Sequence, residues 1–333
     1  MTNEFVEVSV ERLEEMTHAC LETLGLDEEE RSIVAEVLLY AELRGNSQGL
    51  IKIVERTILP AADKQPMQLI QRAPAIAHMQ ANGNIGMVVF DAATRTAIDL
   101  CADGGLAIVT TSGCSSSSGA LGYYANKIAE QGYLAVCMAG SPKVMALHGS
   151  GTPAMGTNPL AFAAPADGET LVIDMASAAI SWFDLLLHAR ENKKLPEKSA
   201  VDSDGRVTQS ADQALEGAIL PFGDAKGSAL ALMIETLTGP LCAAAILGDQ
   251  HDSRGHCIIA LDPLRVGPEP ATQADDSFKC RLTTMLERMR GNNVRLPGEQ
   301  SSSLVTGYRS SNKISVRGWL LRELQAICSD DNV

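Results

Sequence analysis

The stretch that decides the fold runs from His148 to Ile180 and reads HGSGTPAMGTNPLAFAAPADGETLVIDMASAAI. It contains a loop rich in glycine and proline, then apolar runs over 160–164 and 170–175 that are separated by the turn Ala166-Asp167-Gly168. The two runs predict short β-strands. The second run ends on Asp174, and an acid at the end of a buried strand is costly unless something binds it. Asp174 is therefore a candidate site residue.

The rest of the chain mixes helical and strand patterns. Residues 9–44 predict two amphipathic helices, and the second begins at Asp27 with Glu30 completing a capping-box pattern. Further helices are expected near Ser47 and over 87–103, 119–130, 227–238 and the segment around Trp319. Further strands are expected over 106–111, 133–139 and 257–261. We expect a loop over 263–277. Strands mixed with helices predict an α/β fold with a helical N-terminal part.

Composition narrows the classes of function. The chain has 333 residues and 45% hydrophobic content, enough for one large domain or two intertwined ones. A net charge of −14 without a basic cluster argues against nucleic acids and anionic membranes as partners. No apolar run reaches the length of a membrane span, and the N-terminal residues lack a secretory pattern, so we expect a cytoplasmic protein. Its eight cysteines are scattered without a CxxC pair, which favours reduced thiols over zinc ligands or disulfides.

One motif imitates a dinucleotide-binding fingerprint. Gly149–Ala154 fits G-x-G-x-x-A, and Asp174 follows about twenty residues later. That fingerprint needs a strand directly before it and a helix beginning at the second glycine. The nearest strand run ends several residues earlier, and Pro153 and Pro159 oppose a helix there. We therefore expect no Rossmann site.

Seven segments, in order, resemble the malate/L-lactate dehydrogenase family that lacks a Rossmann fold. They are AELRGNSQGLIKI at 41–53, SSGALGYYA at 117–125, GTNPLAFAAP at 156–165, ARENKKLP at 189–196, VDSDGRVTQ at 201–209, LPFGDAKGSALALMIETLTG at 220–239 and VRLPGE at 294–299. The family also contains ureidoglycolate and sulfolactate dehydrogenases and the Δ1-piperideine-2-carboxylate/Δ1-pyrroline-2-carboxylate reductases. The resemblance implies a mixed seven-stranded sheet flanked by helices, a homodimer, and NADPH or NADH as cofactor, with NADP slightly favoured.

The resemblance also implies a division of the chain. Residues 1–115 would form a helical, substrate-side region, onto which residues 290–333 would pack back. Residues 116–289 would form the cofactor-binding sheet domain.

The catalytic residues that the resemblance implies include one departure. Ser47-Gln48-Gly49 stands where the family usually has Ser-His-Gly, and the histidine there exchanges a proton with the substrate in a relay with the serine and a distant aspartate. That aspartate falls on Asp184. Glutamine cannot exchange a proton near neutral pH, although it can donate a hydrogen bond.

The sequence differs from the family pattern at two more places. Lys52 occupies the place of an arginine that holds the substrate carboxylate in the reductase branch, and it keeps the charge without the bidentate fork. Ser117 and Ser118 stand where relatives commonly read His-Phe. Thr157 could meet the substrate carboxylate, although a hydroxyl that stabilises a turn explains it equally well.

Three functions are compatible with these departures. A cyclic ketimine can be protonated before hydride arrives, so its reduction needs no strong acid from the protein; a hydroxy acid requires proton transfer that is worth about 10²–10⁴ in rate. The first hypothesis is therefore an NAD(P)H-dependent reductase of a small cyclic ketimine carboxylate. The alternatives are an altered 2-hydroxy acid dehydrogenase of the malate, lactate or ureidoglycolate type, and a homologue with impaired catalysis.

The resemblance implies cofactor contacts from four segments. They are Asp174-Met175-Ala176, Trp182-Phe183, Asp224-Ala225-Lys226 and Arg295-Leu296-Pro297-Gly298-Glu299. Lys226 and Arg295 are the cations suited to a pyrophosphate or a 2′-phosphate. Lys226 stands near the start of a predicted helix, an unfavourable end for a cation unless an anion binds there.

Histidines offer little further chemistry. His148 could replace the missing acid, but a structural role beside the glycine-rich backbone is the more common one. His251 and His256 do not have the spacing of a helical ligand pair, so we expect no metal site.

Overall fold

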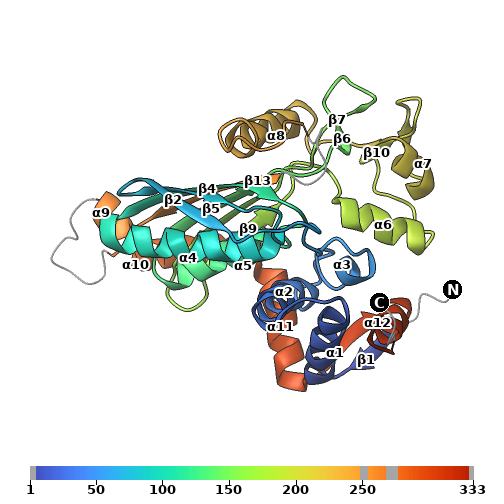
Figure 1. Ribbon diagram of the computed structural model, residues 1–333, viewed down its shortest axis with the longest axis horizontal. Helices are drawn as coiled ribbons and strands as arrows, with labels where there is room; N and C mark the ends of the chain where they lie inside the picture. Colours follow the sequence, from blue (N-terminus) through green and yellow to red (C-terminus); the bar gives the residue numbers. More distant parts are fainter. Residues whose placement is uncertain (1–4, 248–253, 268–276, 330–333) are drawn as a thin grey trace.

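A mixed seven-stranded β-sheet lies at the centre of the computed structural model, which describes residues 5–247, 254–267 and 277–329 (Figure 1). Its strands in spatial order are β2 Gln68–Ala73, β3 Ile76–Gln80, β4 Leu106–Cys114, β13 Arg254–Leu261, β5 Leu134–Ala139, β8 Leu160–Ala164 and β9 Leu171–Met175. β3 and β4 pair in parallel, and the other neighbours in this sheet pair antiparallel. The mixed α/β fold predicted from the sequence is confirmed.

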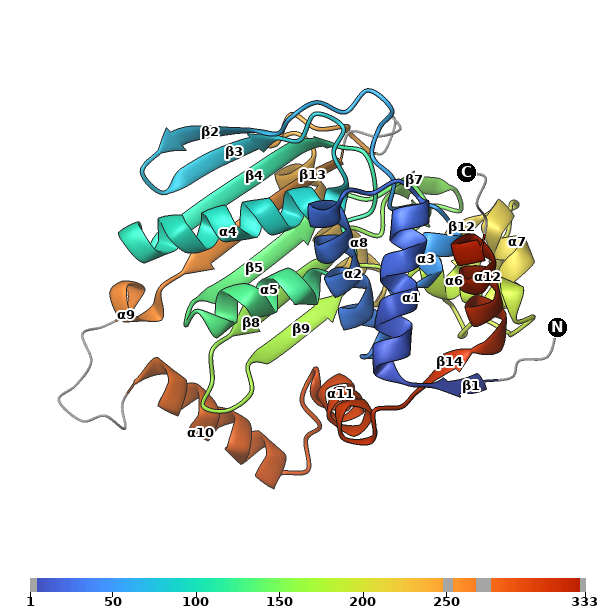
Figure 2. The ribbon, with the colours of Figure 1, turned by 60° about the horizontal axis from the view of Figure 1, so that its bottom comes forward.

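Helices cover both faces of this sheet. α4 (Gly86–Gly104) and α5 (Leu121–Glu130) run along one face, and α8 (Ala225–Thr238) lies on the other (Figures 1 and 2). α4 buries an aliphatic face and ends at Gly105, whose φ of 77° gives the left-handed C-cap that glycine adopts most easily. Each large aliphatic side chain buried in this way contributes about 1.5–3 kcal/mol.

The N-terminal helices pack against the C-terminal end of the chain. α1 (Val10–Thr23) contacts both α2 (Glu28–Glu42) and α12 (Gly318–Ser329). Strand β1 (Phe5–Val8) pairs antiparallel with β14 (Ile314–Arg317). Segments from the two ends of the described chain therefore form one layer beside the sheet.

The predicted capping box at the start of α2 is present. Oδ1 of Asp27 accepts a hydrogen bond from the backbone N–H of Glu30 at 2.9 Å, and the Glu30 carboxylate accepts one from the Asp27 N–H at 3.3 Å. Two backbone donors at the helix start are thereby satisfied.

A smaller lobe is built around a second sheet, of five short strands. It consists of β6 Met145–Ala146, β7 Pro153–Met155, β10 Ala200–Val201, β11 Val207–Thr208 and β12 Ala218–Ile219, with the helices α6 Trp182–Arg190 and α7 Ala211–Glu216. The Gly149–Ala154 motif lies in the loop between β6 and β7 and at the start of β7. Strands β7 and β8 follow it instead of a helix, in agreement with Pro153 in the motif and Pro159 beyond it.

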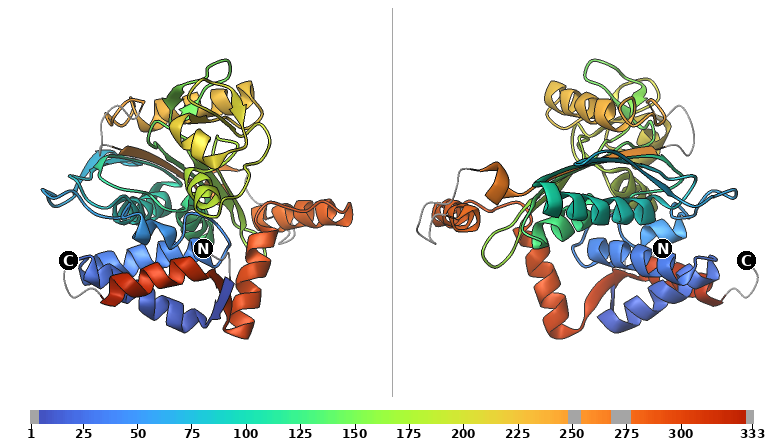
Figure 3. Two further views of the ribbon diagram at one scale, coloured as in Figure 1. Left: turned by 90° about the vertical axis from the view of Figure 1, so that its right-hand side faces the viewer. Right: turned by 60° about the vertical axis from the view of Figure 1, so that its left-hand side comes forward.

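The remaining helices lie at the edges of the fold. They are α3 Ile51–Val54, α9 Pro263–Val266, α10 Phe278–Gly291 and α11 Glu299–Ser311. α10 packs Leu282 and Leu286 against the β8–β9 hairpin, and α10 and α11 extend to one side of the sheet (Figure 3). The segment expected to be a loop over 263–277 begins with α9 and ends at Ser277, the N-cap of α10, and its residues 268–276 lie outside the described residues.

The predicted division at residue 115 needs correction. β2, β3 and β4 all precede residue 115, yet they form one edge and part of the centre of the main sheet. Residues 1–115 are therefore not only a helical region beside the sheet, because β4 pairs antiparallel with β13, a strand from later in the chain. None of the described helices is long and apolar enough to cross a membrane.

Candidate active site

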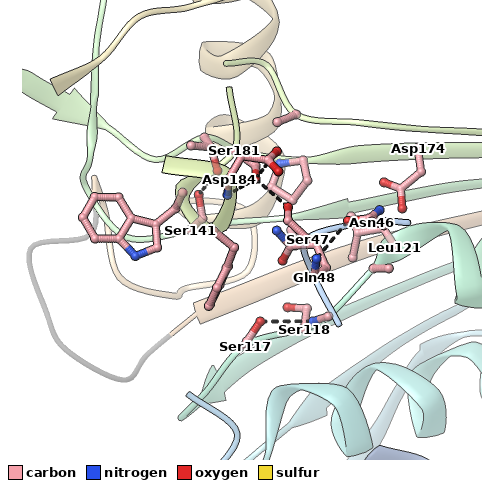
Figure 4. Close-up of a pocket in the computed structure, with 18 of the residues that line it drawn as sticks. Asn46, Ser47, Gln48, Ser117, Ser118, Leu121, Ser141, Asp174, Ser181 and Asp184 are labelled. Atoms are coloured by element: carbon pink, nitrogen blue, oxygen red, sulfur yellow. Dashed lines mark hydrogen bonds between the residues drawn. The ribbon is translucent and has the colours of Figure 1, made fainter. Parts of the chain in front are cut away.

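Two adjoining cavities lie where the main sheet, the N-terminal helices and the smaller lobe meet. The first has a volume of about 650 Å³ and the second about 790 Å³. Both are lined by Arg44, Asn46, Asp174, Met175 and Ser301, so together they form one elongated cleft. Most of the polar groups discussed below surround the first cavity (Figure 4).

The loop that carries Ser47 and Gln48 is held from both sides. Oδ1 of Asn46 accepts a hydrogen bond from the Gln48 backbone N–H at 2.9 Å, and the Glu42 carboxylate accepts one from the Leu50 N–H at 3.0 Å. A Cβ on Gly49 would collide with that carboxylate and lie 3.1 Å from the Glu42 backbone nitrogen, so a larger residue there would displace the carboxylate from the Leu50 N–H. This loop places Ser47 and Gln48 at the wall of the first cavity.

Ser47 is connected to Asp184 through a residue that the sequence did not suggest. Ser181 is the N-cap of α6: its Oγ accepts the Asp184 backbone N–H at 3.0 Å and donates to Asp184 Oδ2 at 2.8 Å. Ser47 Oγ lies 3.0 Å from Ser181 Oγ. Ser47 and Asp184 are therefore connected by a chain of two hydroxyls and a carboxylate (Figure 4).

Lys52 is a buried basic side chain at the wall of the same cavity. Its side chain is 1% exposed, its Nζ donates to Ser117 Oγ at 2.7 Å, and Nζ lies 3.6 Å from the centre of the Phe183 ring. Burial, and then the charge of Arg254, hold the pKa of Lys52 well below its ordinary value. An anion that enters this cavity would stabilise the charged form of this lysine.

Ser118 is held by a buried histidine. His256 is fully buried on β13, its Nε2 lies 2.6 Å from Ser118 Oγ, and its Nδ1 lies 2.9 Å from Thr111 Oγ1. Burial, and then the charge of Arg254, lower the pKa of His256 to about 3, so the ring is neutral. Thr111 Oγ1 also accepts the His256 backbone N–H at 3.2 Å. In the tautomer that carries the ring proton on Nε2, the ring donates to Ser118 and Nδ1 accepts from Thr111.

These contacts set the direction of two hydroxyl groups. Ser117 Oγ accepts from both Lys52 Nζ and the Gly119 N–H, and in the Nε2-protonated tautomer of His256 Ser118 Oγ accepts from the ring. Both serines line the cavity, so each has its own proton available for an acceptor there. This wall of the cavity suits a carboxylate.

Arg254 adds a further cation to the first cavity. It begins β13, beside a shift in register between β13 and β4 that falls between Arg254 and His256. Such irregularities redirect side chains and are common beside functional sites. Arg254 was not found from the sequence, although a charged residue at the start of the apolar run HCIIAL is the same kind of signal that identified Asp174.

Asp174 stands at the junction of the two cavities. Oδ2 accepts the Gly122 N–H in the first turn of α5 at 2.9 Å, and a Cβ on Gly122 would lie 3.1 Å from that oxygen. Burial raises the pKa of Asp174 to about 6, and the Gly122 hydrogen bond opposes this shift. The side chain is nonetheless open to the cleft, so water in the cleft moderates the effect of burial.

The second cavity has the features that a dinucleotide needs. Arg44 lies at its junction with the first cavity, with its guanidinium 3.5 Å from the centre of the Tyr40 ring. Arg290 and Arg309 line the same cavity, together with the beginning of α11. An elongated cleft with arginines along one half fits a nicotinamide dinucleotide and its pyrophosphate.

The structure brings most of the predicted site residues to this cleft. Those at the first cavity are Ser47, Gln48, Lys52, Thr157, Asp174, Met175, Ala176, Trp182, Phe183 and Asp184. Those at the second are Leu296, Pro297, Gly298 and Glu299, with Asp174 and Met175 shared. Asp224, Ala225, Lys226 and Arg295 line neither cavity, and His148 is exposed away from both. Within the described ranges, no cluster of histidine, cysteine or acidic side chains could hold a metal ion.

Comparison with known proteins places this fold and cleft in one class. A profile of the malate/L-lactate dehydrogenase family matches residues 8–325. The (2R)-3-sulfolactate dehydrogenase (NADP(+)) of Chromohalobacter salexigens is 30% identical, over 89% of this chain and 91% of the relative. The ureidoglycolate dehydrogenase (NAD(+)) of Escherichia coli is 33% identical, over 78% and 77%. The crystal structure of Δ1-piperideine-2-carboxylate reductase from Pseudomonas syringae pv. tomato superimposes with a TM-score of 0.85 at 29% identity, over 97% of this chain and 99% of that one.

The chain therefore belongs to the malate/L-lactate dehydrogenase family, whose curated relatives are NAD(P)-dependent oxidoreductases. The family resemblance inferred from the sequence is confirmed. Both NAD(+) and NADP(+) occur in the names of these relatives, so membership by itself does not decide between the two nucleotides.

Proposed function

We propose that this protein is an NAD(P)H-dependent reductase of a small cyclic ketimine carboxylate, of the Δ1-pyrroline-2-carboxylate or Δ1-piperideine-2-carboxylate type. One observation carries the proposal: Gln48 occupies the place of the acid, and no histidine is among the described residues that line the first cavity. A ketimine that is protonated before it reacts has an electrophilic carbon already. It therefore needs no general acid from the protein.

The two walls of the first cavity suit the two ends of such a substrate. The carboxylate would lie against Lys52, Ser117 and Ser118, where a cation and two hydroxyl protons are available. The ring nitrogen would face Ser47 on the other side (Figure 4). Thr157, whose hydroxyl lies 3.3 Å from that of Ser141, would bound the site next to the carboxylate.

The cofactor would lie along the cleft. Arg44, Arg290 and the beginning of α11 would hold its pyrophosphate, and Asp174 and Met175 would meet its middle part at the junction of the cavities. When bound, the nicotinamide supplies the hydride. The arginines of the second cavity favour NADPH slightly, because a 2′-phosphate adds charge there.

A second function is favoured by the Ser47–Ser181–Asp184 chain. A hydroxyl that is connected to a carboxylate could accept the proton of a 2-hydroxy acid during oxidation, as in a malate, lactate or ureidoglycolate-type dehydrogenase. Impaired catalysis is the third outcome, since the usual histidine is Gln48. The expected setting is a homodimer in the cytoplasm; eight cysteines without a CxxC pair support a reducing compartment.

Two measurements test these proposals. Calorimetric titration with NADH and with NADPH should detect binding of at least one, and absence of binding of both at millimolar concentration would contradict an enzyme. A panel of Δ1-pyrroline-2-carboxylate, Δ1-piperideine-2-carboxylate, pyruvate, malate, lactate and ureidoglycolate should then show the highest kcat/KM for a ketimine. A higher kcat/KM for oxidation of a hydroxy acid would favour the second function.

A further inference from the structure

We infer that Ser181 fixes the direction of the Ser47 hydroxyl and so selects a substrate whose reacting heteroatom carries a hydrogen. Ser181 is a specificity-determining residue that acts through Ser47 and need not touch the substrate itself. In the frame of the proposed function, on which the substrate assignment rests, it selects the iminium N–H of a protonated ketimine over the bare carbonyl oxygen of a 2-oxo acid.

The direction follows from counting donors and acceptors around Ser181. Its Oγ accepts the Asp184 backbone N–H at 3.0 Å, which is the helix-capping bond of α6. Its single proton goes to Asp184 Oδ2, at 2.8 Å, because a carboxylate can only accept. The remaining lone pair of Ser181 Oγ faces Ser47 Oγ at 3.0 Å, so Ser47 must be the donor in that contact.

The consequence falls on the atom that faces the cavity. With its only proton directed to Ser181, Ser47 Oγ presents lone pairs alone to a bound substrate. Asp184, behind Ser181, reinforces this polarity through its negative charge. Elsewhere on the cavity wall, Ser117 accepts from Lys52 Nζ and from the Gly119 N–H and so presents its own proton. Ser118 does the same in the tautomer of His256 that donates from Nε2. The cavity is therefore polarised, with acceptors on one side and donors on the other (Figure 4).

This polarity separates C=N from C=O substrates. An iminium N–H donates to Ser47 Oγ. When hydride reaches the ring carbon, the electron pair of the hydride forms the new C–H bond, and the π pair of the C=N bond moves to nitrogen. The nitrogen keeps its proton and becomes a neutral amine, so no further proton is needed. A ketone oxygen would instead face the lone pairs of Ser47, and the alkoxide that forms would have no proton from that side.

The decisive variant is Ser181→Ala, which frees the Ser47 proton to point into the cavity. The ratio of kcat/KM for a cyclic ketimine to that for pyruvate should fall about tenfold or more, the worth of a hydrogen bond to a charged group. Ser181→Thr keeps the hydroxyl and the helix cap and should restore the ratio. Asp184→Asn tests the same polarity without removing a hydroxyl, and its ratio should fall as well.

A binding measurement keeps the test independent of turnover. Pyrrolidine-2-carboxylate carries N–H groups where tetrahydrofuran-2-carboxylate has a ring oxygen, and the two are otherwise similar in size. Calorimetry on the wild-type protein with cofactor should give about tenfold tighter binding of the nitrogen ring, and Ser181→Ala should reduce this preference.

The matched control is Ser210→Ala. Ser210 caps α7 in the same manner as Ser181 caps α6, with its Oγ accepting the Gln213 N–H at 3.4 Å, and it lines neither cavity. Its loss should lower stability and leave both ratios unchanged. Equal binding of the two rings by the wild type, or unchanged ratios in folded Ser181→Ala, would overturn the inference. A wild type that prefers the nitrogen ring but reduces no ketimine would overturn the proposed function alone.

Discussion

Ser118 and His256, which are 138 residues apart in the chain, are joined by a hydrogen bond of 2.6 Å at the inner wall of the substrate cavity. The histidine is neutral and fully buried, with its other nitrogen fixed by Thr111. When the ring donates from Nε2, the Ser118 hydroxyl proton is free to face the cavity. Proton exchange by the ring itself is opposed by a pKa of about 3.

Ser118→Ala and His256→Asn should therefore weaken substrate binding more than they slow the chemical step. We expect KM for a carboxylate substrate to rise about tenfold in Ser118→Ala, with kcat changed less than threefold, because a ground-state contact is lost. Steady-state kinetics at saturating cofactor measures both constants. His78→Asn is the control, since His78 is bonded to Thr110 and Ser112 and lines neither cavity. A fall in kcat with unchanged KM would show that Ser118 acts on the transition state instead.

Lys52→Met should raise KM for a carboxylate substrate about tenfold or more while the cofactor Kd stays nearly constant, because a charge-assisted contact is worth about 1.5–3 kcal/mol. Lys52→Arg keeps the charge and should retain most of the affinity. Kinetics and cofactor titration on the two variants provide the comparison. A change confined to the cofactor Kd would place Lys52 on the cofactor side of the cleft.

The same lysine should affect stability in a manner that depends on pH. Its pKa is lowered in the folded state, so between that pKa and its ordinary value the unfolded chain binds more protons and stability rises with pH. Lys52→Met removes the group, and its free energy of unfolding at pH 7 should exceed that of the wild type by about 1 kcal/mol. Urea unfolding at pH 6, 8 and 10 should show the difference shrinking as pH increases. A difference that is constant across these values would mean that packing, and not charge, is responsible.

Gln48→His introduces the acid that the family resemblance implies at this position. It should increase kcat/KM for pyruvate about a hundredfold, the low end of the usual contribution of proton transfer, and should increase that for a cyclic ketimine much less. The two substrates are compared on one enzyme preparation, with Gln48→Asn as the control for a change of side chain without an acid. Equal gains for both substrates would show that an imine substrate is not the reason why the protein tolerates a glutamine at this position.

Arg295 and Lys226 should differ in their effect on the cofactor. Arg295 precedes Leu296, which lines the second cavity, whereas Lys226 is exposed at the start of α8 and lines neither cavity. Arg295→Ala is expected to weaken binding of NADPH about tenfold, and Lys226→Ala to weaken it less. Titrations with NADH and NADPH should show the larger loss for NADPH if Arg295 meets a 2′-phosphate. The reverse order of the two variants would move the phosphate toward α8.

The sequence alone was sufficient to predict the helices and strands that depend on local periodicity, and to identify the family. The apolar runs that became β8 and β9, the amphipathic α1 and α2, and the Asp27–Glu30 capping box are all encoded by residues close together in the chain. Asp174 was found in the same way, because an acid at the end of an apolar run is unusual whatever the fold around it.

The three-dimensional structure alone decided which distant groups meet. Nothing near Ser47 in the sequence indicates Ser181. The expected separation at residue 115 overlooked the pairing of β4 with β13 in one sheet. The direction of a hydrogen bond also depends on tertiary structure. Ser47 is the donor to Ser181 only because the Ser181 proton goes to Asp184. Sequence periodicity reports which face of an element is buried, but the polarity of a cavity depends on groups that folding brings within about 3 Å of one another.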